Sequence, residues 1–373
     1  MADDPNRSSP TPPQSKRSPW SLLGALLVLA PVAVSVVLYH TDDFHPAPIP
    51  ADYFAAVAPV PERNDRILAI SDRLGEGLLP GPEDLAYDEA SGFLYTGCYD
   101  GWIRRVNLRE EEAKVEDWAF VGGRPLGVVF APGGDLVVAE ADKGLMRVKP
   151  DGTMTMLTNE AEGVKFRLTD GVDVAIDGSI YFTDASYKYN FSEHMLDVLE
   201  GRPHGRLMSF DPSSNQTAVL ARDLYFANGV SVAPDQRSVI FCETMLRRCR
   251  KYHIQGEKKG TVVDFIRDLP GLADNIRYDG QGHYWIGLSA GKTLEWDVLM
   301  KYPLLRKVLV IVEKFIKVPL AVRDSGVLKV DLEGRPLALY SDRGLALVTG
   351  GIQIGKHLYY GSLDKAYISR ILI

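Results

Sequence analysis

The sequence has 373 residues, of which 46% are hydrophobic, so it can bury one large core or two ordinary ones. Its formal net charge of −7 argues against a broad nucleic-acid surface, so we expect no nucleic-acid partner. Three cysteines exclude a disulfide-dense scaffold.

The N-terminal region is predicted to anchor the chain in a membrane. Residues 1–19 are rich in Ser and Pro and are expected to form a disordered cytoplasmic tail. Residues 20–39 are uncharged and long enough for a transmembrane signal-anchor helix. Basic residues precede this run, and Asp42 and Asp43 follow it, which predicts a single-pass type II protein. Its remainder would lie in the lumen of the endoplasmic reticulum or of the secretory or vacuolar system. A cleaved signal peptide, leaving a soluble vacuolar or secreted protein, is the alternative.

Residues 40–61 are predicted to be a linker, and residues 62–373 repeat one pattern six times. Each repeat has short apolar strands separated by turns that contain Gly or Asp, at an interval of about 45 residues. Four such strands per repeat predict an all-β fold, a six-bladed β-propeller, which we expect to be monomeric. The sixth repeat lacks its outer strand. Residues 65–70 are expected to supply this strand and so leave no open sheet edge.

Two insertions interrupt the repeats, at residues 187–202 and 294–322, and each contains a short helical pattern. Both follow the second strand of a repeat, so both should rise from the same rim of the propeller. This placement predicts a lid over the mouth of the central channel. The second insertion has an apolar face and a basic face, so contact with a membrane surface is one alternative, and a helix packed on the propeller rim with its lysines in solvent is another.

The first strand of each propeller blade lines the central channel, and its opening residue lies at one mouth. The opening residues form a set rich in oxygen donors, with Thr169 and Asn275 beside them: Glu83, Leu126, Asp170, Asn228, Asp274 and Thr349. Carboxylates packed this closely would raise one another's pKa. A bound Ca²⁺ would remove the conflict, because carboxylate and amide oxygens are its preferred ligands. Polar side chains around a water-filled channel are the alternative reading.

Two further motifs fit an oxidising, glycosylating compartment. Asn190 and Asn215 lie in N-glycosylation sequons within the predicted lumenal part. Cys242 and Cys249 flank a tight turn and would face each other across a hairpin, within reach of a disulfide; two small buried thiols are the alternative. Cys98 is then left unpaired, and we expect it to pack inside its blade.

Six short strings in order make the chain resemble the strictosidine synthase-like proteins, which include the adipocyte plasma membrane-associated proteins. The wider group contains calcium-dependent propeller hydrolases such as paraoxonase and the gluconolactonases. The strings are 81–84 (GPED), 123–127 (GRPLG), 168–171 (LTDG), 181–186 (YFTDAS), 227–230 (ANGV) and 273–276 (ADNI). The resemblance implies a calcium ion held by Glu83, Asn228, Asp274 and Asn275. Thr169 replaces an Asn of the hydrolases, and Asp170 could compensate for it.

The resemblance also implies a calcium-dependent hydrolase of small molecules with an ester, lactone or phosphoester bond. Leu126 stands where paraoxonase-like enzymes have a histidine, so a carboxylate would have to activate the water. Asp274 and Glu83 are the candidates for ligand or catalytic base. Thr349 stands where strictosidine synthase has its acid/base glutamate, which disfavours the alternative, condensation of an amine with an aldehyde. A non-catalytic ligand-binding propeller is the third possibility.

Overall fold

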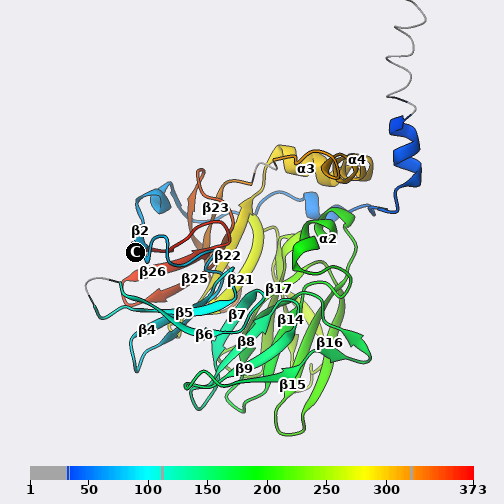
Figure 1. Cartoon of the computed structure of the whole chain (residues 1–373). Helices are drawn as coiled ribbons and strands as arrows, with labels where there is room; N and C mark the ends of the chain where they lie inside the picture. Colours follow the sequence, from blue (N-terminus) through cyan, green and yellow to red (C-terminus); the bar gives the residue numbers. More distant parts are fainter. Residues whose placement is uncertain (1–31, 33, 111–112, 320–321) are drawn as a thin grey trace, which may run out of the picture.

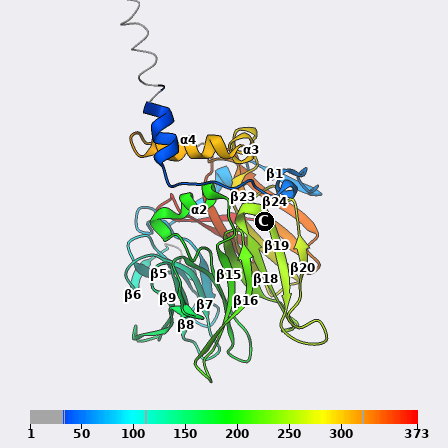
Figure 2. The same ribbon diagram turned by 90° about the vertical axis from the view of Figure 1, so that its right-hand side faces the viewer.

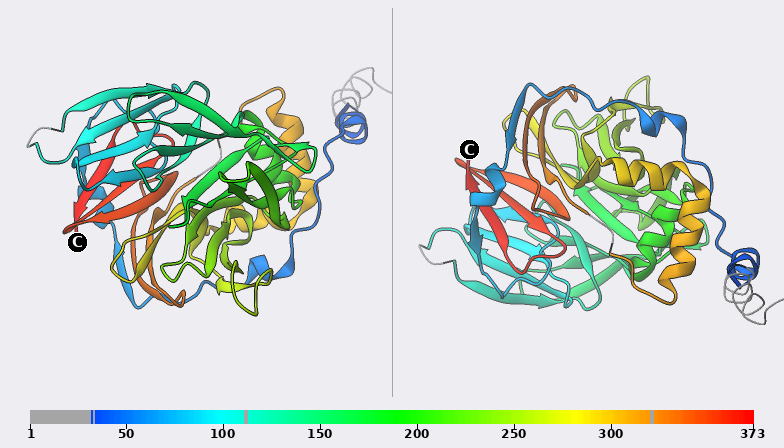
Figure 3. Two further views of the ribbon diagram at one scale, coloured as in Figure 1. Left: turned by 90° about the horizontal axis from the view of Figure 1, so that it is seen from below. Right: turned by 90° about the horizontal axis from the view of Figure 1, so that it is seen from above.

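The structure, a computed structural model, describes residues 32, 34–110, 113–319 and 322–373. Its strands form six main sheets arranged in a ring, with helices on one face (Figures 1 and 3). This arrangement confirms the six-bladed propeller that the repeats predict. A small hairpin of β11 (Glu160–Ala161) and β12 (Val164–Lys165) lies between the second and third blades in the chain.

In each blade the strands follow one another outward from the channel. The first blade contains β3 (Leu85–Asp88), β4 (Phe93–Gly97), β5 (Trp102–Asn107) and β6 (Val115–Phe120), and the second β7 (Pro125–Phe130), β8 (Leu136–Glu140), β9 (Gly144–Val148) and β10 (Met154–Thr158). The third contains β13 (Thr169–Val174), β14 (Ile180–Asp184), β15 (Gly205–Asp211) and β16 (Gln216–Leu224), and the fourth β17 (Ala227–Val232), β18 (Ser238–Glu243), β19 (Arg248–His253) and β20 (Val262–Ile266). The fifth contains β21 (Gly271–Tyr278), β22 (His283–Gly291), β23 (Ser325–Asp331) and β24 (Pro336–Asp342), and the sixth β25 (Val348–Ile354), β26 (His357–Ser362) and β27 (Ile368–Leu372).

The ring closes through β2 (Asp72–Leu74), which pairs antiparallel with β27 as the outer strand of the sixth blade. The prediction that residues 65–70 form this strand is wrong. Instead β1 (Glu62–Asp65) pairs parallel with β24 in the fifth blade, and η2 (Ile67–Ile70) is a 3₁₀ turn. Arg66 takes a left-handed conformation, with φ of 70°, which ends β1. Leu68 then packs among buried residues of the fifth and sixth blades, so this segment fills space between two sheets.

Glycines let the inner strands approach one another closely. A Cβ atom on Gly171 would lie 2.7 Å from the Asn228 carbonyl oxygen, and one on Gly229 would lie 2.5 Å from the Ile276 nitrogen. Any larger residue would therefore push neighbouring blades apart. Because each of these glycines follows an opening residue, the same close approach brings the opening residues together at the channel mouth.

The helical insertions lie on one face of the propeller (Figures 1 and 2). The first forms η3 (Phe191–Glu193) and α2 (His194–Glu200), and the second forms α3 (Leu294–Lys301) and α4 (Pro303–Glu313). The segment assigned as a linker crosses the same face and contains η1 (Ala51–Phe54). Tyr53 is buried there, and the Ala47 amide donates to the Glu200 carbonyl oxygen at 2.8 Å. This segment is therefore packed on the propeller.

Residues 1–19 and most of the predicted membrane span, residues 20–39, lie outside the described residues. Residues 34–41 are helical and point away from the propeller (Figure 1). No helix within the described ranges combines the length and the apolar character needed to cross a bilayer.

Cys242 and Cys249 are direct neighbours on β18 and β19 and are joined by a disulfide. Their Cα atoms are 3.9 Å apart. The predicted bond is thus confirmed, and Cys98 is a buried free thiol, as expected. The turn that pairs them is η4 (Thr244–Leu246), followed by Arg247 in the left-handed conformation.

Candidate functional site

A cavity of about 380 Å³ lies at the channel mouth, between the inner strands and the helical insertions. Polar side chains predicted from the repeats contribute to it: Glu83, Asp170, Asn228 and Asp274. Leu126 lies beside them. Apolar side chains from both insertions also line it: Phe191, Met195, Val198, Trp296, Val318 and Val322. The cavity therefore combines acidic and amide groups with an apolar lining, and both insertions border it, as predicted for elements over the channel mouth.

Two oxygen atoms in the cavity residues are buried without a hydrogen-bond partner. One is Oε2 of Glu83, and the other is Oδ1 of Asn228. The second carboxylate oxygen of Glu83, Oε1, accepts a hydrogen bond from Asn275 Nδ2 at 2.6 Å. A buried oxygen without a partner costs free energy, so each of these atoms calls for a ligand that the described part of the chain does not supply.

Burial and mutual repulsion raise the pKa of the acidic residues. Burial, followed by the carboxylates of Asp274, Asp84 and Asp170, raises the pKa of Glu83 well above its usual range. Burial and the same kind of repulsion raise the pKa of Asp170. Burial raises the pKa of Asp274 to about 7, although hydrogen bonds from Asn228 and Ser289 oppose this rise. These groups can all ionise together only if a positive charge joins them.

Arg124 is the cationic side chain nearest in sequence to the second-blade opening, and it is buried. Its guanidinium lies over the rings of Tyr99 and Phe191, at 5.5 Å and 5.8 Å from their centroids. Its charge acts to lower the pKa of Glu83 and of Asp170, but burial and the other carboxylates outweigh it. Arg124 therefore compensates the acidic cluster only in part.

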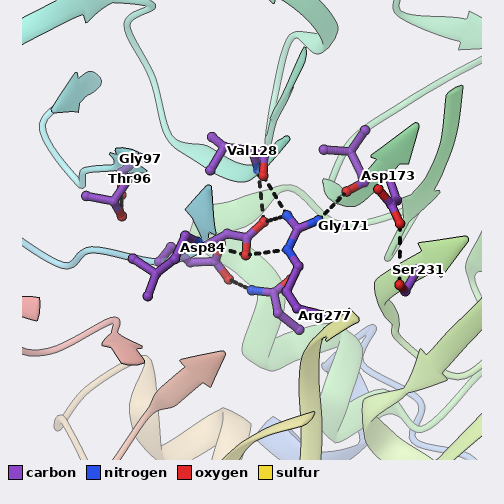
Figure 4. Close-up of polar contacts among 12 residues, drawn as sticks. Asp84, Thr96, Gly97, Val128, Gly171, Asp173, Ser231 and Arg277 are labelled. Atoms are coloured by element: carbon purple, nitrogen blue, oxygen red, sulfur yellow. Dashed lines mark hydrogen bonds and ion pairs between the residues drawn. The ribbon is translucent and has the colours of Figure 1, made fainter. Parts of the chain in front are cut away.

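The side chain of Arg277 extends across the channel between the inner strands that carry the acidic residues (Figure 4). Its Nε donates to Asp84 Oδ1 at 3.2 Å, and one of its terminal nitrogens also donates to the Asp84 carboxylate. The terminal nitrogens donate in addition to the Val128 carbonyl oxygen at 2.6 Å and to the Val172 carbonyl oxygen at 3.2 Å. Asp84 also accepts from the Val128 amide at 3.0 Å. One guanidinium thus ties the fifth blade to the first three. Sequence reasoning missed this role because nothing in the string 273–278 marks Arg277 as reaching across the channel.

Three of the predicted polar residues lie outside the cavity lining. Asn275 and Thr349 both hold Glu83, the first through the carboxylate and the second through a hydroxyl that donates to the Glu83 carbonyl oxygen at 2.6 Å. Thr169 is fully buried, and its hydroxyl has no hydrogen-bond partner among the described atoms. The assignment of Thr169 and Asn275 as metal ligands stays a prediction.

The residues of the cavity fit a hard cation such as Ca²⁺. Such ions take carboxylate and amide oxygens, which are the atoms left without partners on Glu83 and Asn228. Asp170 and Asp274 add further carboxylates to the same cavity. The described part of the chain holds no group of three or more His, Cys, Asp and Glu side chains arranged as metal ligands. The fit therefore depends on a mixed set of carboxylate and amide oxygens.

His194 also lines the cavity, a contribution that the sequence did not reveal. Its Nδ1 lies 2.8 Å from the Phe191 carbonyl oxygen, which can only accept, so Nδ1 carries the hydrogen. Nε2 of the neutral ring is then an acceptor. Burial lowers the pKa of His194, which favours this neutral form. His194 lies on α2, so the pattern of the inner strands does not mark it; its place in an insertion over the channel mouth is the signal that points to it.

The two sequons lie in different surroundings. Asn190 caps η3, and its side-chain oxygen accepts from the Glu193 amide at 3.2 Å. Asn215 lies in the exposed turn between β15 and β16. Glycosylation at either site stays a prediction.

Residues 170–257 match the family profile described as strictosidine synthase, and residues 62–106 match the one described as strictosidine synthase-like, N-terminal. The protein strictosidine synthase-like 6 of Arabidopsis thaliana is 50% identical over 349 residues, which cover 92% of this chain and 93% of that protein. The adipocyte plasma membrane-associated protein of Bos taurus is 32% identical over 328 residues, covering 81% of this chain and 78% of that protein.

Solved structures of six-bladed type share the fold at low sequence identity. A gluconolactonase from Xanthomonas campestris superposes with a TM-score of 0.58 at 17% identity, covering 88% of this chain and 98% of that one. Regucalcin from Agrobacterium tumefaciens, a calcium-binding protein, superposes with a TM-score of 0.58 at 13% identity, covering 83% and 95%. At these identities the likeness establishes the fold alone.

Proposed function

The chain belongs to the strictosidine synthase-like family, and from this premise we propose that its propeller is a calcium-dependent hydrolase of small molecules with an ester, lactone or phosphoester bond. One observation carries the proposal. Glu83 Oε2 and Asn228 Oδ1 are buried without hydrogen-bond partners among the described residues, in a cavity that Asp170 and Asp274 also line. The regucalcin and gluconolactonase named above share this fold, which supports the choice of cation and of reaction class.

Glu83, Asn228, Asp170 and Asp274 would hold the calcium ion, with Thr169 and Asn275 as further proposed ligands. When bound, calcium would supply a Lewis acid that polarises the carbonyl or phosphoryl oxygen of the substrate. The hydrogen bond from Asn275 to Glu83 Oε1 orients that carboxylate so that Oε2 remains available. The ion pair of Arg277 with Asp84 holds the inner strands from which these side chains project.

The chain offers two kinds of group that could take a proton from the attacking water. Asp274 and Glu83 are the two carboxylate candidates, and the one that does not hold the calcium ion would be free to act as the base. The pKa of about 7 of Asp274 applies to the metal-free cavity, because it would fall beside a bound cation. His194 offers Nε2 as a neutral acceptor in the same cavity. The apolar side chains Phe191, Met195 and Trp296 would exclude bulk water and hold the non-reacting part of the substrate. We therefore infer a small, largely apolar substrate.

The disfavoured alternative is condensation of an amine with an aldehyde. That reaction needs an acid/base group, which the resemblance to strictosidine synthase places on the inner strand of the sixth blade. Thr349 occupies the position, and its hydroxyl donates to the Glu83 carbonyl oxygen at 2.6 Å. A hydroxyl used in this way is a poor acid or base near neutral pH.

We also propose that the propeller lies in an oxidising lumen of the secretory system, with the chain held as a single-pass type II protein through residues 20–39. The disulfide between Cys242 and Cys249 supports this placement, because such bonds persist in oxidising compartments. Protection of the propeller from protease in sealed microsomes tests it, and digestion without detergent would contradict it.

Hydrolysis by the full chain tests the proposed function. Aryl esters, lactones and phosphotriesters are assayed before and after EDTA treatment, and then after CaCl₂ or MgCl₂ is restored. We expect activity to disappear with EDTA and to return with calcium. Activity that persists unchanged after EDTA would refute the mechanism. Calcium binding without turnover of any ester, lactone or phosphoester would instead favour the non-catalytic propeller.

A further inference from the structure

Helix α4 has the opposite arrangement of polar and apolar side chains from that of an ordinary surface helix. Its buried residues are Arg306, Lys307 and Val310. Arg306 is fully buried, and its guanidinium donates to the carbonyl oxygens of Leu199 and Ala47. A surface helix normally turns its charges to water and its apolar stripe to the core. Here the charged side chains attach the helix to α2 and to the N-terminal segment at residues 42–47, so its apolar stripe is left facing outward.

The outward stripe is continued by the residues that follow α4, and we call the whole set the apolar face. Its members are 38% to 69% exposed: Leu304, Leu305, Val308, Val312, Phe315 and Ile316. No described part of the chain covers them. Contiguous exposed apolar side chains of this kind mark a surface that has a partner. The members within α4 form one side of this helix, which lies across the face of the propeller (Figure 1).

The neighbouring chain indicates what that partner is. The helix at residues 34–41 stands beside α4 in two views at right angles to each other (Figures 1 and 2). The end of this helix is fixed to α4. Lys307 Nζ lies 4.7 Å from the centroid of the Tyr39 ring and donates to the Asp42 carbonyl oxygen at 3.0 Å, and Lys314 pairs with the Asp42 carboxylate at 2.5 Å.

Residues 20–39 form the uncharged segment of the sequence, and its end is therefore held against α4. Val34, Val36 and Val37 of this helix are themselves exposed. Lys301 and Lys317 are exposed and lie just before α4 and just after the apolar face in the chain, where anionic headgroups would meet them. An apolar stripe bordered by lysines, and joined to an uncharged chain segment, matches a lipid surface in both chemistry and position.

We propose that the apolar face of α4 lies in the interface of a lipid bilayer, with Phe315 and Ile316 among the acyl chains and the flanking lysines at anionic headgroups. The same insertion supplies Trp296 and Val322 to the cavity, so this contact places the cavity mouth near the membrane. The proposal concerns lipid contact, and it stands whether or not the cavity hydrolyses anything.

Fluorescence quenching in vesicles tests the contact. The full chain is mixed with vesicles of phosphatidylcholine and phosphatidylserine, and the vesicles are isolated by flotation. Leu305→Cys and Phe315→Cys variants carry an environment-sensitive nitrobenzoxadiazole label, because Cys98 is buried and Cys242 and Cys249 are bonded to each other. Ile176→Cys is the matched control. Ile176 is also apolar and exposed, but it follows the end of β13 that lies away from the cavity.

We expect lipids with a nitroxide in the acyl chain to quench labels at 305 and 315 several-fold more than a label at 176. Equal quenching at all three positions, or a chain that does not float with the vesicles, would overturn the proposal. A second outcome would also overturn the proposal. If the lipids do not quench the labels at 305 and 315, and in detergent these labels become less accessible to solvent as the protein concentration rises, a second copy of the chain covers this face.

Discussion

Arg277 on the inner strand of the fifth blade forms an ion pair with Asp84, which directly precedes the inner strand of the first, across the channel of the propeller (Figure 4). Both side chains are largely buried, and the same guanidinium also bonds the carbonyl oxygens of Val128 and Val172. The contact fixes the inner strands relative to one another immediately beside Glu83. It therefore links the stability of the ring to the geometry of the cavity.

Replacing Arg277 with Met should destabilise the chain by roughly 3–5 kcal/mol, because it leaves the Asp84 carboxylate buried without its partner. Denaturation in urea measures the change. Arg335→Met is the matched control, since Arg335 pairs with Asp331 at 2.6 Å on the surface, where loss of a pair costs about 1 kcal/mol or less. The double variant with Asp84→Asn should recover part of the loss. Equal effects of Arg277→Met and Arg335→Met would show that the buried pair has no special role.

Glu83→Gln should change stability and calcium binding in opposite directions. The amide keeps the shape and an oxygen for Asn275, but it removes a carboxylate whose pKa is raised by burial and by its neighbours. The metal-free chain should therefore melt at a higher temperature, whereas calcium affinity should fall at least about tenfold because a charged ligand is lost. Calorimetry measures both. Exposed Glu257→Gln is the control. Unchanged calcium affinity in Glu83→Gln would remove Glu83 from the ligand set.

Stability of the metal-free chain should fall as the pH rises. Asp274 has a folded-state pKa of about 7 against an ordinary value of 3.8, so between these values the folded chain binds more protons than the unfolded one. The stability that Asp274 contributes is thus full below the lower value and is lost as the pH passes the higher one. Melting temperatures recorded from about pH 5 to about pH 8 in EDTA check this. A melting temperature that increases over this range would contradict the raised pKa.

Calcium should reverse that dependence. Its ligands must be ionised, so calcium affinity should increase with pH across the same range, and binding near pH 6 should release protons. Titration calorimetry in two buffers of different ionisation enthalpy counts the protons. We expect net release at about pH 6 and less at about pH 8. Binding without any proton release at the lower pH would mean that the carboxylates are already ionised in the metal-free chain.

His194→Gln should lower kcat of the proposed hydrolysis by about 10²- to 10⁴-fold, the range typical of a lost general base. Calcium affinity should stay the same, because His194 is not among the proposed ligands. His357→Gln, at the start of β26 and therefore at the opposite end of its blade, is the control. A kcat equal to that of the unchanged chain would leave the carboxylates Asp274 and Glu83 as the groups that accept the proton.

The repeats and the hairpin disulfide could be predicted from the sequence because the signals are local. A strand alternates over a few residues, a turn is marked by Gly or Asp, and Cys242 and Cys249 are seven positions apart. The opening residues of the cavity follow from the same repeats, since each blade presents its first strand to the channel. Glu83, Asp170, Asn228 and Asp274 line the cavity for this reason.

The tertiary structure decided what depends on residues far apart in the chain. Residues 65–70 and residues 72–74 are both short, partly apolar segments that could close the ring. Leu68 packs between the fifth and sixth blades, so residues 72–74 form β2 and pair with β27. Arg277 contacts Asp84, which is 193 positions away in the sequence. Arg306 of α4 is buried because the carbonyl oxygens of Leu199 and Ala47 lie where its guanidinium can donate to them. An amphipathic pattern shows that a helix has a polar face and an apolar face. Which of the two packs against the rest of the protein depends on the groups that the folded chain places opposite the helix.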